Sequence, residues 1–337
     1  MLVIALISRR LALLLPVLFG VSLLTFLLSH VVPGDPARML AGIHAGAAQV
    51  QAVRHSYGLD RPLPAQYWAY ISNLLHGDLG VALHTQRGVG TDLRDFLPAT
   101  LELGLAAMLI AVLIGIPLGT LAAVGRNRFP DHFSRLLALG GVSLPIFWVA
   151  LVAQLVLYYN LGWFPSGGRL DPTLTPPNTV SGFYTIDSLL AGRLDLLVNA
   201  LWHLVLPALV LSLGPLAVVM RITRSGVLEA LGKHYVRTAR AKGVRRRTVV
   251  IRHALRNALL PTMTVIGLQF GYLLGGAVLV EYIFSWPGIG LYTAQSITAS
   301  DYPAIMGVTI SVACLYVLLN LLVDIGYSLL DPRIRYR

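Results

Sequence analysis

The 337-residue chain has few charged residues and a single cysteine. Charged side chains make up 12% of the chain, about half the share found in soluble globular proteins, whereas hydrophobic residues make up 56%. This composition excludes a soluble globular protein and indicates an integral membrane protein. Because Cys314 is the only cysteine, an intrachain disulfide is also excluded.

The sequence also lacks motifs for nucleotide and metal binding. The nearest approach to a phosphate-binding loop has five residues between Gly226 and Gly232 where the motif requires four. It also has His234 where a serine or threonine would contact magnesium. No His-Glu-x-x-His sequence or cysteine pair is present for a zinc site. We therefore predict that the chain hydrolyses no ATP and binds no cofactor or metal itself.

Six apolar runs are long enough to cross a hydrocarbon core about 30 Å thick, which takes about 20 helical residues. They cover residues 11–31, 101–124, 136–158, 201–220, 263–284 and 304–330. The first run is longer than the apolar part of a cleavable signal peptide, so we interpret it as a retained span. Prolines inside the runs are compatible with helices in a membrane bundle. The sequence predicts an all-α integral membrane protein with six transmembrane helices.

The Lys and Arg residues are unevenly distributed between the two sides of the membrane. Nineteen of the 26 lie in residues 9–10, 126–135, 221–256 and 333–337, which the six spans place on one side. The side richer in cations is the cytoplasmic one, so both termini are predicted to be cytoplasmic. This bias explains the net charge of +11, and because stacking aromatics are not interleaved with the cations, we predict no nucleic-acid binding.

A few polar residues lie within or at the ends of the apolar runs. Ser143, Gln269, Glu281 and Asn320 are our candidates for a hydrophilic path through the membrane. Their alternative role is hydrogen bonding between helices, which is the commoner one in membrane bundles. Glycines in the fifth run, including Gly275, predict close helix packing.

Acidic residues are scarce in the runs. Asp324 is the clearest embedded acid, and because it is isolated, a paired structural carboxylate is favoured over a proton relay. Glu102 and Glu281 lie near the ends of runs, where we expect them to reach water. A gradient-driven transporter would be expected to contain several embedded acids or broken helices in inverted repeats, so the sequence favours that class less.

Residues 221–261 form a basic segment with eleven cations and one acid, Glu229. The cations are Arg221, Arg224, Lys233, Arg237, Arg240, Lys242, Arg245, Arg246, Arg247, Arg252 and Arg256. Each Lys or Arg at the centre of a membrane helix costs about 2.5–3.5 kcal/mol, so this segment must lie outside the bilayer. An ordinary solvated loop is one interpretation. Small residues beside the charges and the predicted helix end at Gly243 favour short helices that dock onto a partner.

At these residues the sequence resembles the inner-membrane permease subunits of ABC importers. That family has a cytoplasmic loop signature of Glu-Ala-Ala, a later Gly, and a terminal Leu-Pro. Here Thr238-Ala239-Arg240 stands at the Glu-Ala-Ala place, and Gly243 and Leu259-Leu260-Pro261 match the rest. The missing Glu departs from the general signature but is similar to the peptide branch, in which the loop commonly reads as residues 237–243 do.

Further motifs along the chain support the resemblance to the peptide branch. They are Pro33-Gly34-Asp35-Pro36, Gly77-Asp78-Leu79-Gly80, the Phe284–Gly290 sequence Phe-Ser-Trp-Pro-Gly-Ile-Gly, Asp301-Tyr302-Pro303, and residues 320–335. The chain most resembles the first of the two permeases in dipeptide importers. The wider branch also carries oligopeptides, nickel chelates and glycosides, so the substrate stays open.

The resemblance implies a type I importer permease fold and a set of partners. These are a second, similar permease, two cytoplasmic ATPase subunits that bind ATP and magnesium, an external peptide-binding protein, and the lipid bilayer of a bacterial inner membrane. The ATPase-coupling loop would contain Arg237, Thr238, Ala239, Arg240, Ala241, Lys242, Gly243, Leu259, Leu260 and Pro261. The chain would divide into a first span (1–31), a long external segment (32–98), a transporter core (99–331, with the coupling loop at 221–261) and a tail (332–337).

An intramembrane enzyme is the remaining alternative. It would need convergent acids, a metal set or a nucleophile paired with a base at the bilayer surface, and the sequence shows none of these. The sequence therefore favours a non-catalytic membrane subunit of a transporter.

Overall fold

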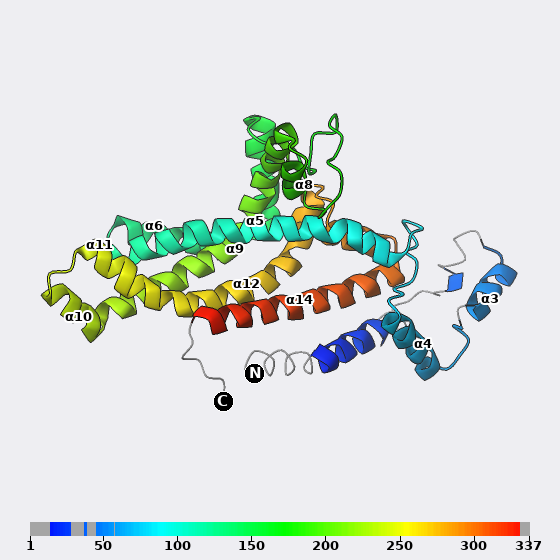
Figure 1. Cartoon of the computed structure of the whole chain (residues 1–337). Helices are drawn as coiled ribbons and strands as arrows, with labels where there is room; N and C mark the ends of the chain where they lie inside the picture. Colours follow the sequence, from blue (N-terminus) through cyan, green and yellow to red (C-terminus); the bar gives the residue numbers. More distant parts are fainter. Residues whose placement is uncertain (1–13, 28–36, 39–44, 57, 331–337) are drawn as a thin grey trace. The chain divides into compact units, whose positions relative to one another are not determined.

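A computed structural model describes residues 14–27, 37–38, 45–56 and 58–330 of the chain (Figure 1). The described residues form helices joined by turns, with no strand among them beyond an isolated bridge between Val81 and Gly88. Two compact units are present: Met1–Asp95 with Tyr292–Leu318, and Phe96–Leu291 with Leu319–Arg337. The all-α class predicted from the sequence is confirmed.

In the first unit, the apolar helix Leu14–Leu27 is followed by α3 (Ala47–Ser56) and α4 (Leu63–Leu75). Aromatic side chains of α4 pack on helix Leu14–Leu27. Tyr67 lies with its ring 5.2 Å from that of Phe26, and its hydroxyl is 2.9 Å from that of Ser22. These contacts fix α4 beside helix Leu14–Leu27, which lies within the first predicted span.

Among the described residues, three helices are long and apolar enough to cross a membrane: α5 (Val89–Val124), α9 (Leu194–Gly232) and the Tyr302–Leu321 part of α14 (Tyr302–Leu330). Two further candidates are bent pairs. One joins α6 (Phe129–Ser143) to α7 (Ile146–Ala153) and the π-helical η1 (Gln154–Asn160), and the other lies within Arg246–Ile283. With helix Leu14–Leu27, each of the six predicted runs overlaps one of these helices or bent pairs. The count of six crossings remains a prediction.

The run at residues 136–158 does not form the single straight helix that we predicted from its length. Helix α6 ends at Ser143, and the chain turns by 104° before α7 begins at Ile146. Pro145 explains the break, because proline has no N–H to donate and disfavours a helical conformation at the residue before it. Leu144 accordingly has extended dihedral angles, with φ −84° and ψ 132°.

Helix α9 is the centre of the second unit and packs against α6, α7, α8 (Tyr184–Leu190) and α12 (Arg256–Ile283). At 1.5 Å per residue its 39 residues span about 58 Å, far more than the hydrocarbon core needs. Its neighbours bury a continuous apolar core that includes Leu103, Leu206, Leu211, Met220, Leu273 and Trp286. The excess length carries the basic residues 221–232 beyond that core.

Close contacts between helices in the second unit depend on glycine. A Cβ atom on Gly119 of α5 would lie 2.5 Å from the carbonyl oxygen of Met220, and one on Gly141 of α6 would lie 2.8 Å from that of Leu213. Small residues matter here because lipid tails are as apolar as the side chains and give helices little hydrophobic reason to associate. Gly275, which we expected to serve close packing, has no neighbour within 4 Å of its Cβ position.

Candidate functional site

The basic segment is mostly a continuation of two long helices. Residues 221–232 complete α9, and the chain then forms α10 (His234–Ala241), the single turn α11 (Arg246–Thr248) and the π-helical η2 (Val249–Leu255), which leads into α12. Leu259, Leu260 and Pro261 lie inside α12 and not in a loop. The short connecting part is therefore residues 233–245, with α10 at its centre.

Helix α10 has one buried face and one exposed face. Val236 and Ala239, three residues apart, pack against Val249 of η2, with Leu231 and Val244 at the edge of the cluster. This spacing places both side chains on one side of the helix. We had expected Ala239 to face a partner, but it packs inward and fixes α10 to its own chain.

The exposed face of α10 contains Arg237, Thr238, Arg240, Ala241 and Lys242. Three of these side chains, Arg237, Arg240 and Lys242, are long and cationic, and the small residues Thr238 and Ala241 lie among them. This face combines short side chains, which allow close approach, with cations that can pair with acids of a partner.

Gly243 ends α10 as the sequence predicted. Its φ is +74°, in the left-handed region, and its amide donates to the Arg240 carbonyl oxygen at 2.9 Å. The Val244 amide donates to the Ala239 carbonyl oxygen at 3.2 Å. These two bonds form a Schellman motif, in which glycine is favoured because other residues are strained at positive φ.

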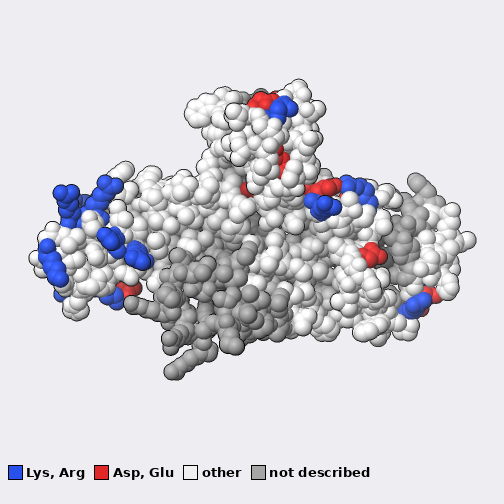
Figure 2. Space-filling view, viewed as in Figure 1, with Lys and Arg blue, Asp and Glu red and all other residues white. Residues whose placement is uncertain are grey.

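Two cations of the basic segment are paired within the chain. Arg224 binds Asp131 of α6 through two bonds of 2.6 and 3.0 Å, and Lys233 pairs with Glu229 at 2.9 Å. Within the described residues, none of the other nine cations forms an ion pair with an acid. Figure 2 shows Lys and Arg side chains gathered at the end of the unit that carries α10 and α11. This charged surface is available to a negatively charged partner.

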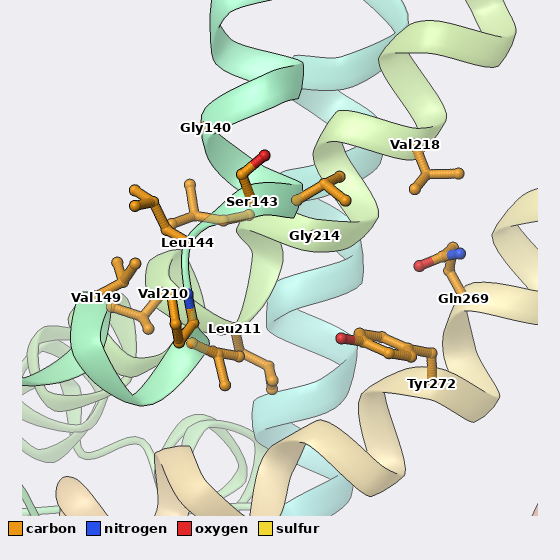
Figure 3. Close-up of a pocket in the computed structure, with 15 residues that line it drawn as sticks. Gly140, Ser143, Leu144, Val149, Val210, Leu211, Gly214, Val218, Gln269 and Tyr272 are labelled. Atoms are coloured by element: carbon orange, nitrogen blue, oxygen red, sulfur yellow. The ribbon is translucent and has the colours of Figure 1, made fainter.

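A cavity of about 440 Å³ lies in the second unit where α6 breaks from α7. Figure 3 shows Ser143 at the end of α6, Gly214 and Val218 on α9, and Gln269 and Tyr272 on α12 around it. Two of the predicted path residues, Ser143 and Gln269, therefore line one cavity. Tyr272, which sequence reasoning missed, adds a third polar group; it lies three residues beyond Gln269 on the same helix face.

Glu281 lies elsewhere and has no exposed surface. Its carboxylate accepts hydrogen bonds from the Thr100 hydroxyl at 2.7 Å, the Gly290 amide at 2.6 Å and the Leu291 amide at 3.1 Å. A Cβ atom at Gly288 would lie 2.5 Å from that carboxylate. Our expectation that Glu281 reaches water is wrong, because the turn after α12 folds over the carboxylate, and the first turn of α13 (Ile289–Thr298) and Thr100 of α5 supply its donors.

Glu102, which we also expected to reach water, is buried in the same unit. It forms an ion pair with Arg169, and the Thr185 amide and hydroxyl donate to its other oxygen at 2.9 and 2.6 Å. The Arg169 guanidinium lies 3.6 Å from the centre of the Tyr184 ring. This pair could not be predicted from the sequence, because Arg169 comes from an irregular segment 67 residues away.

Two residues of the last helix, Asn320 and Asp324, stand out in the sequence, and the structure describes the side chain of only the first. Asn320 is half-buried in α14 and lines neither of the cavities named for the described residues. The side chain of Asp324 lies outside the described residues.

The first unit contains a buried polar cluster that sequence reasoning missed. Asp301 has no exposed surface and accepts the His84 amide at 3.0 Å and its ring nitrogen at 2.7 Å. Asp92, equally buried, accepts the Tyr292 hydroxyl at 3.1 Å and the Thr85 hydroxyl at 2.6 Å. Burial and the nearby Asp92 charge raise the pKa of Tyr292, so it remains a hydrogen-bond donor. These bonds tie residues 84–92 to α13 (Ile289–Thr298) and to the start of α14.

Comparison with known proteins places the chain in one family over nearly its whole length. Residues 115–336 match the family described as "Binding-protein-dependent transport system inner membrane component". Residues 2–104 match the corresponding N-terminal family, "Binding-prot-dependent transport system membrane comp, N-term".

Individual relatives agree with this placement. The chain is 51% identical to the probable D,D-dipeptide transport system permease protein of Escherichia coli K12 over 94% of each chain. It is 48% identical to the di/tripeptide transport system permease protein of Pseudomonas aeruginosa UCBPP-PA14, and 39% identical to a glutathione transport system permease protein of Escherichia coli O6:H1, each over 98% of both chains. The chain therefore belongs to the family of inner-membrane components of binding-protein-dependent transport systems, and is a multi-pass permease subunit of an ABC importer.

Proposed function

We propose that this chain forms half of the path by which an ATP-driven importer carries dipeptides across the bacterial inner membrane. The observation that carries the proposal is the exposed basic face of α10, held on the chain by Val236 and Ala239. The substrate class is inferred from relatives at 43–51% identity whose names specify dipeptide transport.

The partners are a second, similar permease, two cytoplasmic ATPase subunits and an external peptide-binding protein. ATP and magnesium bind to the ATPase subunits. Helix α10 occupies a groove of one ATPase, and residues 237–243 make the contact. Leu259, Leu260 and Pro261 support it from within α12 and do not enter the groove. Closure of the ATPase pair pushes on α10 and is transmitted along α9.

The path runs past the cavity at the α6–α7 break, with Ser143 and Gln269 among its polar groups. Asn320 remains a candidate. Glu281 is better assigned to a structural role, since its described side-chain hydrogen bonds come from the first turn of α13 and from Thr100. Both termini are cytoplasmic, and residues 99–331 form the transporter core, with the first span (1–31), the external segment (32–98) and the tail (332–337) outside it.

Uptake of a labelled dipeptide into proteoliposomes tests the proposal. The co-expressed complex is reconstituted with ATP inside and the binding protein outside. ATP-dependent accumulation of dipeptide is expected, with none when ATP is replaced by a non-hydrolysable analogue.

Other outcomes assign the chain differently. ATPase activity that the binding protein stimulates without dipeptide uptake would keep the permease assignment and move the substrate to glutathione, longer peptides, nickel chelates or glycosides. If no ATPase co-purifies in detergent and an ion gradient alone drives uptake, the chain is a gradient-driven transporter and the coupling role of α10 is wrong.

A further inference from the structure

A second cavity in the described part of the chain has three arginines and no acid in its lining. It has a volume of about 550 Å³ and lies between α6 and α9. Arg135 comes from α6, and Arg221 and Arg224 come from α9; Ser134 and Ser225 add hydroxyl groups. Its volume lies within the range of about 300–1,000 Å³ that is typical of small-molecule sites.

The one acid near these arginines is already saturated. Asp131 has no exposed surface and accepts the Asn127 amide, two bonds from Arg224 and two from Arg135. A carboxylate offers about four lone-pair sites, so Asp131 has none left for Arg221. Three guanidinium groups against one carboxylate leave two positive charges uncompensated. Within the described residues Arg221 forms no ion pair, and its side chain is exposed.

The arginine cavity adjoins the cavity assigned to the path. Val142 and Ser143 line both of them. The polar groups around Gln269 and Tyr272 therefore lead along the end of α6 toward the arginines. Since the arginines lie on the side with most cations, an anion moving inward along this route would reach them late in its passage.

We propose that Arg221 and Arg135 bind the C-terminal carboxylate of the peptide on its way into the cytoplasm. This inference rests on the proposed function and deepens it. Guanidinium and carboxylate groups form strong, charge-assisted pairs, often with two parallel hydrogen bonds. Every peptide with a free C-terminus carries a carboxylate there, so the subsite recognises peptides as a class and does not discriminate between their side chains. Arg224 and Arg135 both donate to Asp131 through two nitrogens. The Arg224 side chain is 20% exposed and serves to position the site, whereas that of Arg135 is 54% exposed and keeps further donors for a ligand.

The test compares a dipeptide with its C-terminal amide, which lacks the charge. The whole complex is placed in nanodiscs of phosphatidylcholine without the binding protein, and equilibrium binding of labelled dialanine and dialanine amide is measured. We expect Arg221→Gln to weaken dialanine binding about tenfold and amide binding less than about twofold, the difference expected for one lost charge-assisted hydrogen bond. Arg221→Lys should bind dialanine with an affinity between those of the wild type and Arg221→Gln.

Arg126→Gln is the matched control. Arg126 is an exposed arginine on the same predicted side and lines neither cavity. The same loss of charge there should leave binding of both ligands unchanged. Arg135→Gln should repeat the selective loss, which guards against an effect peculiar to one variant.

Three results would overturn the proposal. The first is equal binding of dialanine and its amide by the wild type. The second is a ratio of dialanine affinity to dialanine-amide affinity that is the same in Arg221→Gln as in the wild type. The third is seen in a parallel set of nanodiscs that also contain labelled phosphatidylglycerol: if Arg221→Gln loses binding of this lipid while dialanine binding persists, the arginines are assigned to a lipid phosphate. Dialanine uptake with the binding protein present separates these failures from failure of the proposed function, since the subsite can be wrong while uptake continues.

Discussion

Two ends of the second unit differ in how their charged residues are used. At the end that carries α8, the acids Glu102, Asp187 and Glu281 are buried, and each accepts hydrogen bonds from a loop or from the first turn of a helix. At the end that carries α10, Arg237 and Arg240 are exposed and form no ion pair within the described residues. The first set of charges organises the fold, and the second is left for another molecule.

The physical cost of burial explains this difference. A buried charge is stable only when donors replace the water that it has lost, so each acid near α8 is surrounded by amides, hydroxyls or an arginine. An exposed cation keeps its water and can exchange it for a partner's carboxylate. Substitutions near α8 should therefore reduce stability, and substitutions on α10 should reduce transport in a protein that still folds.

Glu281→Ala should have the largest effect. It leaves the Thr100 hydroxyl and the Gly290 and Leu291 amides without their acceptor in a buried site. An unsatisfied buried donor costs about 1–3 kcal/mol, so we expect a loss of about 3 kcal/mol or more. Thermal unfolding of the purified complex in detergent measures it.

The matched control for that substitution is Glu229→Ala. It removes an exposed acid that pairs only with Lys233 on the surface, so the unfolding temperature should hardly change. Equal destabilisation by the two substitutions would refute the anchoring role of Glu281.

Substitutions on α10 should abolish transport without unfolding the chain. Arg240→Glu reverses a charge on the exposed face, and Gly243→Val places a β-branched residue at φ +74°. Backbone strain of this kind costs about 1–3 kcal/mol, enough to disrupt the end of one short helix. We expect ATP-dependent dipeptide uptake to fall about tenfold or more in each variant, with normal amounts of protein in the membrane.

Gly243→Asn separates conformation from size. The Cβ position of Gly243 has no neighbour within 4 Å, and asparagine tolerates positive φ better than valine does. This variant should keep most of the uptake. Wild-type uptake in both Arg240→Glu and Gly243→Val would rule out α10 as the docking element.

Much of the fold could be predicted because long apolar runs in a membrane can hardly form anything but helices. The end of α10 at Gly243 was also predictable, since glycine suits the left-handed conformation there. The break at Pro145 was not, because Pro207 and Pro215 lie inside α9 without ending it. Which proline breaks a helix depends on neighbours that the sequence does not identify.

The positions of charged residues were predicted less well. The ion pair between Arg169 and Glu102 joins a helix to an irregular segment, and no periodicity connects them. Glu281 was placed near water because it lies at the end of an apolar run, but the following turn covers it. In the same way Ala239 was expected to face a partner, whereas its spacing from Val236 places it on the buried face.

Arg224→Gln should have an intermediate effect, since it leaves Asp131 buried with only Arg135 and one amide as partners. We expect a loss of about 1–3 kcal/mol in unfolding free energy and a partial loss of uptake, because the pair ties α6 to the extension of α9 that carries α10. Lys233→Gln breaks an exposed pair on the same helix and should change stability little. Similar stability changes in both variants would contradict the linking role of Arg224.

The smallest effect should be a pH dependence at Asp187 of α8, whose carboxylate holds the loop that precedes that helix. Burial favours its neutral form, but bonds from the Ser181 hydroxyl and from the amides of Ser181 and Gly182 outweigh this and hold its pKa below the ordinary value. A pKa lowered by folding means that the ionised carboxylate stabilises the protein above about pH 4, and that this contribution is lost as the pH falls through the folded-state pKa.

Asp187→Asn should therefore unfold at a lower temperature than wild type at pH 7, with the difference narrowing below about pH 4. Asp195→Asn, which removes an exposed acid paired with Arg193, should show a smaller difference at every pH because water screens that pair. If the difference in unfolding temperature between wild type and Asp187→Asn stays constant from pH 7 to about pH 3, the charge of Asp187 does not hold the loop before α8. The acids near α8 would then stabilise the fold through shape and neutral hydrogen bonds, and the contrast with the cations of α10 would rest on burial alone.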